Sequence, residues 1–313
     1  DPLRESSGYH GLIQVLLMGV SGAFLTGDLF NLYVWFEVML VSSFVLMAMH
    51  RTREQIAAAF KYVTLNLVAS SLFLTALGLL YGGTGTLNMA DLATVFQQRE
   101  MGPYELTLAM MLFTAFGIKA ALFPLFFWLP ASYHTPPAAV SAVFAGLLTK
   151  VGVYALIRVF TLFFPHAPPE FHALVLAQAA CTMVAGLIGA LTQRDFRRVL
   201  SFNLVGHLGY TTVGLGLMTQ TALAASMFYM FHHIFVITNL YLVGGMFLRL
   251  RRTTSFPALG SILRDYPYAA ALSMIPVFSL AGVPPLSGFV GKLALIRATF
   301  GAGAWWSGGI ILA

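Results

Sequence analysis

Four charged side chains lie inside long apolar stretches of the sequence, where a charge is costly and where it can exchange protons. Glu37 stands near the middle of the run 28–49, and Lys119, Lys150 and Lys292 lie inside later apolar runs. Each unpaired charge at the centre of a bilayer costs roughly 2.5 to 3.5 kcal/mol on insertion scales. The four groups must therefore be paired or hydrated, and we expect them to form a proton relay.

The type of basic residue supports this expectation. The chain has thirteen arginines and four lysines, and three of the four lysines lie deep in apolar runs. Arginine keeps its proton, whereas a lysine in a poor solvent can lose its proton near neutral pH. We expect Glu37 and Lys119, at matching depth, to form an ion pair. A Glu–Lys pair can also be structural glue between helices, and that alternative stays open.

Five further residues have two interpretations each. Lys61 lies near the end of a run, where it either snorkels to the interface or joins the relay. His207, His232 and His233 lie in apolar runs, where each can bridge a water chain or simply be a hydrogen-bonded core residue. His134 lies in a loop and is either a proton-uptake group or only a loop residue.

The composition indicates an integral membrane protein. Of 313 residues 58% are hydrophobic and 9% charged, and the mean hydropathy is +0.82, whereas soluble domains carry roughly a quarter charged residues. The net charge of +6 then marks topology rather than a nucleic-acid partner. Cys181 has no partner cysteine, so neither a disulfide nor a cysteine metal site is expected. The chain begins with Asp and ends a few residues into an apolar run, so we interpret it as an internal piece of a longer protein.

The apolar runs predict an all-α protein with about nine spans, because each is long enough to cross roughly 30 Å of hydrocarbon. No alternation of polar and apolar residues suggests a β-barrel. The arginine-rich loops begin near Arg51, Arg194 and Arg249, separated by four spans and then by two, which places all three on the cytoplasmic side. Arg158 and Arg297 are exceptions that can snorkel. The runs are 10–26, 28–49, 59–82, 107–130, 138–162, 172–192, 198–218, 221–248 and 268–299.

Two of these runs contain helix breakers. Pro124 interrupts the fourth run, and Pro284 and Pro285 lie about halfway along the ninth. Proline removes a helical hydrogen bond, and irregular backbone at membrane depth is tolerated only where protein or a water-filled cavity covers it. Paired interruptions five helices apart are typical of inverted-repeat transporters with a site near the midplane. The alternative is a simple packing kink at each proline.

Several longer motifs carry a family resemblance that covers essentially the whole chain. The segments "GIKAALFPLFFWLPASYHTPPAAVSAVFAGLLTKVGVYALIR", "QRDFRRVLSFNLVGHLGYTTVGLG" and "SLAGVPPLSGFVGKLALI" resemble the antiporter-like subunits of energy-converting membrane complexes. The segments "GDLFNLYVWFEVML" and "TLNMADL" favour the D-subunit family of Mrp-type multisubunit sodium/proton antiporters. The resemblance implies an antiporter-like inverted repeat of five-helix bundles, with halves at 1–162 and 163–313, the second truncated.

The resemblance also implies roles for the buried charges. Glu37 is the coupling acid, Lys119 its partner, Lys150 the central relay lysine and Lys292 the terminal one. Many relatives carry a lysine where this chain has Ile237, so His232, His233 or water would have to bridge that gap. The family has fourteen helices, which leaves three before this chain and most of two after it.

The implied function is a proton-translocating subunit of a multisubunit Na+/H+ antiporter in the bacterial inner membrane. Its partners would be H+, Na+, the lipid bilayer, a larger antiporter-like subunit and small membrane subunits, with no cofactor, metal or nucleic acid. The alternative within the superfamily is a proton-pumping subunit of a respiratory NADH dehydrogenase or membrane-bound hydrogenase. A membrane enzyme that uses His232 and His233 is a rival from another class, weakened by the lack of an HExxH or aspartate-rich motif. A purely structural scaffold would not explain the buried lysines.

Overall fold

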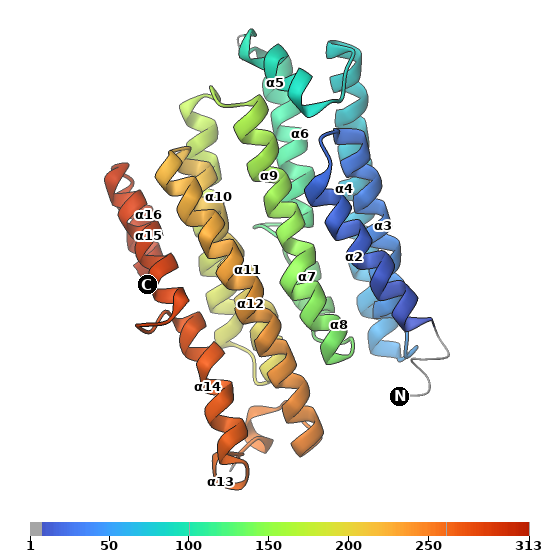
Figure 1. Cartoon of the computed structure of the whole chain (residues 1–313), viewed down its shortest axis with the longest axis vertical. Helices are drawn as coiled ribbons and strands as arrows, with labels where there is room; N and C mark the ends of the chain where they lie inside the picture. Colours follow the sequence, from blue (N-terminus) through green and yellow to red (C-terminus); the bar gives the residue numbers. More distant parts are fainter. Residues whose placement is uncertain (1–7, 100, 261, 313) are drawn as a thin grey trace.

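The computed structural model describes residues 8–99, 101–260 and 262–312, and in these ranges the chain forms helices that run up and down beside one another (Figure 1). The long helices are α2 (Tyr9–Leu25), α3 (Leu29–Met47), α4 (Arg53–Thr84), α6 (Pro103–Lys119), α9 (Thr149–Phe163), α10 (Pro169–Leu191), α11 (Phe196–Leu217), α12 (Gln220–Arg251), α14 (Pro267–Ala281) and α15 (Ser287–Gly301). The short ones are α5 (Met89–Gln97), α7 (Trp128–Ser132), α8 (Ala138–Val143), the π-helix η1 (Phe144–Leu148), the 3₁₀ turn η2 (Phe256–Ala258), α13 (Ile262–Asp265) and α16 (Trp305–Leu312).

The apolar runs of the sequence coincide with these helices. Within the described ranges, five continuous helical stretches are long and apolar enough to cross a membrane: 29–47, 53–84, 138–163, 169–191 and 220–251. The helices α2 and α14 are shorter and apolar. Large apolar side chains such as Phe60, Leu191 and Phe235 point outward, which suits a surface in contact with lipid.

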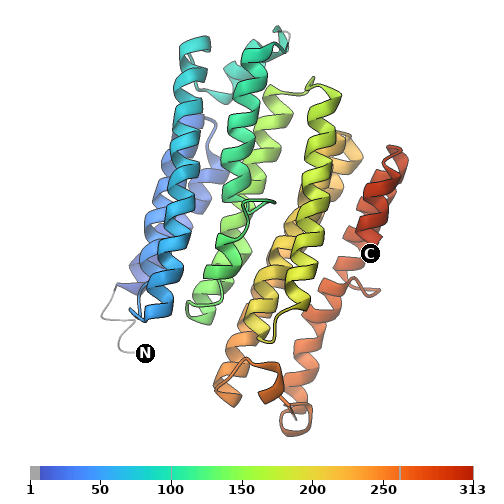
Figure 2. The same ribbon diagram turned by 180° about the vertical axis from the view of Figure 1, so that it is seen from behind.

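The three arginine-rich loops lie at the same end of the bundle, as the sequence predicted (Figure 2). These loops follow α3, α10 and α12. At the opposite end lies α5, in a segment that the sequence pattern indicated only as a connection. The side chain of Asn88 accepts hydrogen bonds from the amides of Ala90 and Asp91, and this N-cap starts a helix that the surrounding Gly and Thr residues concealed.

Side-chain caps begin four of the long helices. Asp28 caps α3 and Asp195 caps α11, while Thr52 caps α4 and Thr219 caps α12. Each side-chain oxygen accepts from a backbone amide of the first turn, which would otherwise be unsatisfied. The two acid-capped helices and the two threonine-capped helices form matching pairs, and α4 and α12 are both 32 residues long.

An antiparallel bridge recurs next to each acidic cap. Asp28 pairs with Asn88, and Asp195 pairs with Ser255. Both bridges use two backbone hydrogen bonds, for example from the Leu29 amide to the Leu87 carbonyl at 2.9 Å. The first bridge lies at the α5 end of the bundle and the second at the α13 end.

Two helices are interrupted where the sequence placed its breakers. The helix α6 ends at Lys119, and irregular backbone around Pro124 leads into α7; the helix α14 ends at Ala281, and α15 begins at Ser287 after Pro284 and Pro285. The Phe123–Pro124 and Pro284–Pro285 peptide bonds are cis.

Polar side chains of α10 supply hydrogen-bond partners for the backbone groups that the first interruption leaves free. The Phe123 amide donates to the Thr182 hydroxyl at 3.0 Å, and the Gln178 side-chain amide donates to the Phe123 carbonyl at 2.8 Å. The Trp128 indole N–H donates to the Ile118 carbonyl at 3.0 Å. Backbone groups at membrane depth require such partners because no water is available in the hydrocarbon.

Candidate functional site

Glu37 and Lys119 are joined through a serine. The Ser70 hydroxyl of α4 donates to Glu37 Oε1 of α3, and Lys119 Nζ at the end of α6 donates to Ser70 Oγ at 3.0 Å. In the described ranges the ion pairs are Arg99–Glu105 and Arg251–Asp265, so the expected direct Glu37–Lys119 pair is wrong. The reason is that α4 packs between α3 and α6. A hydroxyl both accepts and donates, so the bridge is a continuous link for a proton.

Aromatic rings enclose this link. Lys119 Nζ lies 4.8 Å from the centre of the Phe36 ring, a cation–π distance. Phe73 and Phe116 pack edge to face beside it, with ring centres 4.7 Å apart. Lys119 is only 6% exposed. Low polarity around the chain strengthens every electrostatic contact within it.

The polar face of α4 continues past Ser70. Tyr62 and Asn66 precede Ser70 at four-residue spacing, and all three are buried. Residues four apart lie on one face of a helix. The Ser43 and Tyr62 hydroxyls lie 2.7 Å apart. This periodic set of polar residues is the signal that could have revealed Ser70 from the sequence.

A small cavity extends from Lys119 toward the next helix. It has a volume of about 20 Å³, and its lining includes Tyr62, Asn66, Lys119 and Leu148. That volume is enough for about one water molecule, and the side chains of Tyr62, Asn66 and Lys119 supply polar partners. Leu148, two residues before Lys150 in the chain, also lines this cavity.

Lys150 is fully buried, and its amine is held by a backbone carbonyl. Lys150 Nζ donates to the Ala145 carbonyl at 2.5 Å. Ala145 belongs to η1, a π-helical turn, and such turns recur at functional sites because they disturb the regular hydrogen-bond ladder. The turn packs against α12, where an added Cβ on Gly146 would lie 2.3 Å from Thr238 Oγ1. Lys150 therefore lies beside the helix that carries the paired histidines.

The two neighbouring histidines of α12 point to different helices. The His233 ring stacks on the His207 ring of α11, with centres 4.9 Å apart. The His207 Nδ1 atom lies 2.5 Å from the Tyr229 hydroxyl, and His232 Nδ1 lies 2.9 Å from the Ser287 hydroxyl. All three histidines are buried. Tyr229 and Ser287 were absent from the sequence predictions, because neither residue type by itself indicates a proton path.

Lys292 differs from Lys150 in that it borders an open cavity. Its amine donates to the Ala281 carbonyl at 3.1 Å and lies 5.4 Å from the centre of the Tyr210 ring. Ala281 is the last residue of α14, where the helix interruption leaves the carbonyl available. The cavity measures about 380 Å³, and its lining includes Asn203, His207, Tyr210 and Lys292.

Ile237 lies one turn beyond His233 and is fully buried in the apolar core. The gap that the sequence indicated between Lys150 and Lys292 is therefore filled by hydrocarbon at this position. Within the described residues, no group of three or more His, Cys, Asp or Glu side chains is arranged to hold a metal ion.

Lys61 and His134 share another cavity at the arginine-rich end, about 460 Å³ in volume. The His134 Nδ1 atom lies 2.9 Å from the Pro130 carbonyl, and the Arg198 Nε–H group donates to His134 Nε2 at 3.3 Å. The acceptor role of Nε2 defines a neutral imidazole that donates from Nδ1. Burial and the Arg198 cation both lower the pKa of His134 below its usual range.

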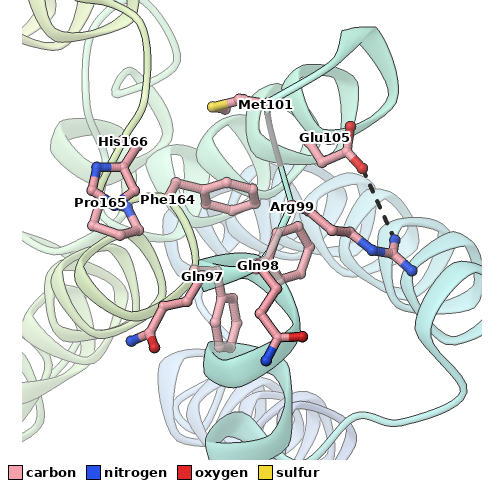
Figure 3. A pocket seen from close by; sticks show the side chains of 10 residues that line it. Gln97, Gln98, Arg99, Met101, Glu105, Phe164, Pro165 and His166 are labelled. Carbon is pink, nitrogen blue, oxygen red and sulfur yellow. Dashed lines mark ion pairs between the residues drawn. The ribbon is translucent and has the colours of Figure 1, made fainter.

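A cavity at the α5 end lies apart from the buried charges (Figure 3). It measures about 380 Å³ between α5, α6 and the loop after α9. Arg99 and Glu105 face each other on one side, 4.0 Å apart, and Phe164, Pro165 and His166 form the opposite wall. It contains none of the residues predicted from the sequence.

The sequence and fold were compared with known proteins. A profile of the NADH:quinone oxidoreductase/Mrp antiporter transmembrane family matches residues 26–313. The D subunit of a Na+/H+ antiporter from Alkalihalophilus pseudofirmus is 46% identical over 297 residues, which cover 95% of this chain and 60% of the relative. The corresponding D subunit from Bacillus subtilis is 40% identical over 309 residues, 99% of this chain and 63% of the relative. The chain thus spans less than two thirds of the length of these relatives.

Solved structures share the fold, and two of them serve as examples. A chain in the structure of the Mrp complex from a Dietzia species matches with a TM-score of 0.90 and 33% identity. The match covers 99% of this chain and 59% of the Dietzia chain. An archaeal membrane-bound sulfane sulfur reductase, a respiratory complex, matches with a TM-score of 0.92 and 30% identity, over 97% and 62%. Ion-exchange and redox complexes therefore contain the same helical architecture.

Proposed function

The chain belongs to the NADH:quinone oxidoreductase/Mrp antiporter transmembrane family, and on that premise we propose that it belongs to a proton-translocating subunit of a multisubunit Na+/H+ antiporter. The observation that carries the proposal is the hydrogen-bonded chain Glu37–Ser70–Lys119 inside an apolar bundle. A half-buried acid and a buried amine, linked by a hydroxyl, are expensive at this depth. They are expected where charge has to move.

Glu37 is the coupling group in this proposal. A negative Glu37 attracts a protonated Lys119 through Ser70, and neutralising or displacing Glu37 removes that attraction. The proton of Lys119 then moves toward Lys150 by way of the small polar cavity at Tyr62 and Asn66. Lysine can perform this step because it can release its proton, whereas arginine cannot.

The second part of the path runs from Lys150 to Lys292. The geometry that supports it is the stacked pair His207–His233 beside the π-helical turn, together with the cavity that both His207 and Lys292 line. An imidazole both donates and accepts, so it relays protons between waters and side chains. His232 instead bonds to Ser287 of α15, so His233 is the histidine of α12 that lies on this path. The Ile237 side chain cannot carry a proton, so the proposed path between Lys150 and Lys292 passes along His233 instead.

We further propose nine membrane crossings and two inverted halves, 1–162 and 163–313. Support comes from the paired acidic caps, the two bridges at opposite ends, the two 32-residue helices and the two interrupted helices. The arginine-rich end is the cytoplasmic one, in a bacterial inner membrane. The partners are a larger antiporter-like subunit, small membrane subunits, H+ and Na+.

A proton-pumping subunit of a respiratory complex is the second candidate. The fold favours neither candidate, because the Mrp and the sulfane sulfur reductase structures match almost equally. The two D-subunit relatives, at 46% and 40% identity, favour the antiporter. No step of the proposed path needs a catalytic motif, so we propose a transporter subunit rather than an enzyme.

The test is Na+-driven proton movement in proteoliposomes that contain the complete complex, followed with a pH-sensitive dye. Glu37→Ala should abolish the signal, while size-exclusion chromatography shows the complex intact. Near-normal transport by this variant would refute the coupling role. Loss of assembly would instead favour the structural interpretation of the Glu37–Lys119 connection.

A further inference from the structure

The cavity at the arginine-rich end has the composition of an amphipathic binding site. It lies between α4, α7 and α11, with a volume of about 460 Å³. Its charged lining consists of Glu54, Lys61 and Arg198, and its apolar lining includes Phe126, Phe127 and Phe202. Two cations against one carboxylate leave a net positive site beside an aromatic wall.

The two cations have unused hydrogen-bond donors. Arg198 uses its Nε–H group on His134 and its backbone amide on Asp195, so the guanidinium Nη groups have no partner in the described ranges. Lys61 is exposed, and its amine likewise has no hydrogen bond to a described residue. A guanidinium fork with free N–H groups fits the oxygens of a phosphate, and an ammonium adds a point charge.

His134 fixes the direction of the Arg198 side chain. Its Nδ1–H group donates to the Pro130 carbonyl, so Nε2 is the acceptor for Arg198 Nε at 3.3 Å. With Nε anchored on α7 and its following loop, the remaining guanidinium nitrogens are held near the mouth of the cavity. An anchored arginine loses less conformational entropy when it binds an anion than a free one does.

The cavity reaches from the headgroup region of a bilayer to the edge of the hydrocarbon, because its lining on α4 runs from Glu54 to Lys61. Lys61 lies eight positions after Arg53, where α4 begins, or about 12 Å along the helix axis at 1.5 Å per residue. The helix is 32 residues long, about 48 Å, so its ends extend beyond roughly 30 Å of hydrocarbon. Phe127 is 57% exposed next to the cavity, as expected for a side chain in contact with an acyl chain.

We propose that this cavity binds an anionic phospholipid, with its phosphate on Arg198 and Lys61 and an acyl chain along Phe126 and Phe127. A free phosphate would use only the basic part of the lining, whereas a phospholipid uses both parts. Basic pockets between transmembrane helices on the cytoplasmic side are a recurrent form of lipid recognition. Bound there, the lipid connects α4 and α7 with α11, and the proposal is independent of the path taken by protons.

The test is native mass spectrometry of the detergent-solubilised complex, incubated separately with phosphatidylglycerol, phosphatidylethanolamine and inorganic phosphate. We expect phosphatidylglycerol to stay bound to the complex. Added phosphatidylethanolamine should not replace it, and millimolar phosphate should not displace it. Arg198→Gln and Lys61→Gln should each weaken this binding about fivefold, because a basic residue near the membrane surface contributes about that factor. The matched control is Arg194→Gln, an exposed arginine at the same end outside the cavity lining.

Each other outcome overturns the proposal. Displacement by inorganic phosphate would define a free-anion site, and equal retention of phosphatidylethanolamine would define unspecific lipid contact. If Arg194→Gln weakened phosphatidylglycerol binding equally, the binding would depend on the overall charge of this end of the protein and not on the cavity. Circular dichroism and size-exclusion chromatography of Arg198→Gln separate a lost site from a misfolded complex.

Discussion

The helices α4 and α12 each have a row of three residues, spaced four apart, at the same distances from their N-caps. Only the row on α4 is polar at all three positions. Tyr62, Asn66 and Ser70 lie ten, fourteen and eighteen positions after the cap Thr52, and Tyr229, His233 and Ile237 lie at the same distances from the cap Thr219. Both tyrosines bond to the acid-capped helix beside them, Tyr62 to Ser43 and Tyr229 to His207. At the last position Ser70 joins an acid to a lysine, whereas the Ile237 side chain is hydrocarbon and cannot form such a link.

The lysines differ in the same sense. Lys119 is enclosed and has a carboxylate at the other end of its hydrogen-bonded chain. Lys292 is half-buried, bonds only a backbone carbonyl and borders a cavity of about 380 Å³. The comparison suggests a division of labour in the proposed path: an internal charge acts on the proton of Lys119, whereas Lys292 has access to a cavity. Five changes would break or sharpen this difference.

The largest effect is expected at Lys150, because in the proposed path it is the step between Lys119 and Lys292. Lys150→Ala should reduce Na+-driven proton transport by roughly a hundredfold, the order of effect for losing a proton-transfer group. Lys150→Arg should be almost as damaging, since it keeps the charge but cannot release a proton. The dye assay in proteoliposomes measures both. A fully active arginine variant would show that charge alone is enough.

The second effect tests the serine bridge of the first half. Ser70→Ala removes the hydroxyl that receives Lys119 and binds Glu37, and hydrogen bonds to charged groups contribute about 1.5 to 3 kcal/mol. Transport should therefore fall roughly ten- to a hundredfold. Ser71→Ala is the matched control, because the neighbouring Ser71 is exposed. Equal activity of the two variants would mean that Glu37 and Lys119 communicate without Ser70.

The third effect concerns the histidines of α12, which in the proposed path replace the polar group missing at Ile237. His233→Leu removes the stack on His207 and should slow transport roughly tenfold, whereas His232→Leu should have little effect. Ile237→Lys should be tolerated and should restore part of the activity lost in His233→Leu. Replacement of both histidines without any change in rate would exclude a path along α12.

The fourth effect is on stability and concerns the interruption between α6 and α7. This interruption is held by Gln178 and Thr182 of another helix, so Gln178→Leu or Thr182→Val should destabilise the fold by about 1 kcal/mol each. A fall of a few degrees in the thermal midpoint of the purified complex is the expected readout. Thr192→Val, at the exposed end of the same helix, serves as the control and should leave the midpoint unchanged.

The smallest effect concerns His134 at the edge of the first half. Its pKa is lowered by burial and by Arg198, so Arg198→Gln should raise that pKa toward the ordinary value of about 6.5. Because the unfolded chain binds this proton more readily, the site destabilises the fold as the pH falls below about 6.5. The Arg198→Gln variant should therefore lose less folding stability at low pH than the wild type does. Histidine ¹⁵N chemical shifts across a pH titration measure it, and an unchanged titration would exclude Arg198 as a cause.

Much of the architecture could be predicted because hydrocarbon imposes simple rules. Long apolar runs predicted the long helices, the placement of arginines predicted which loops share an end, and Pro124, Pro284 and Pro285 lie where α6 and α14 give way to α7 and α15. The short helix α5 was missed, because an N-cap of one Asn is a weak signal beside the Gly and Thr residues that precede it. The π-helical turn at Ala145 was also missed, since its residues suit an α-helix equally well.

The sequence by itself determined which residues are expensive to bury without a partner, because the cost of an unpaired charge in hydrocarbon follows from its type and depth. That is why Glu37, Lys119, Lys150 and Lys292 could be selected from the order of the amino acids alone. Only the tertiary structure decided how they are connected. It placed α4 between α3 and α6, so that Ser70 and not direct contact joins Glu37 to Lys119, and it turned His232 and His233 toward different helices. A hydrogen bond forms or fails with a change of a few tenths of an ångström in the distance between donor and acceptor. For side chains far apart in the sequence, only the packing of the helices sets that distance.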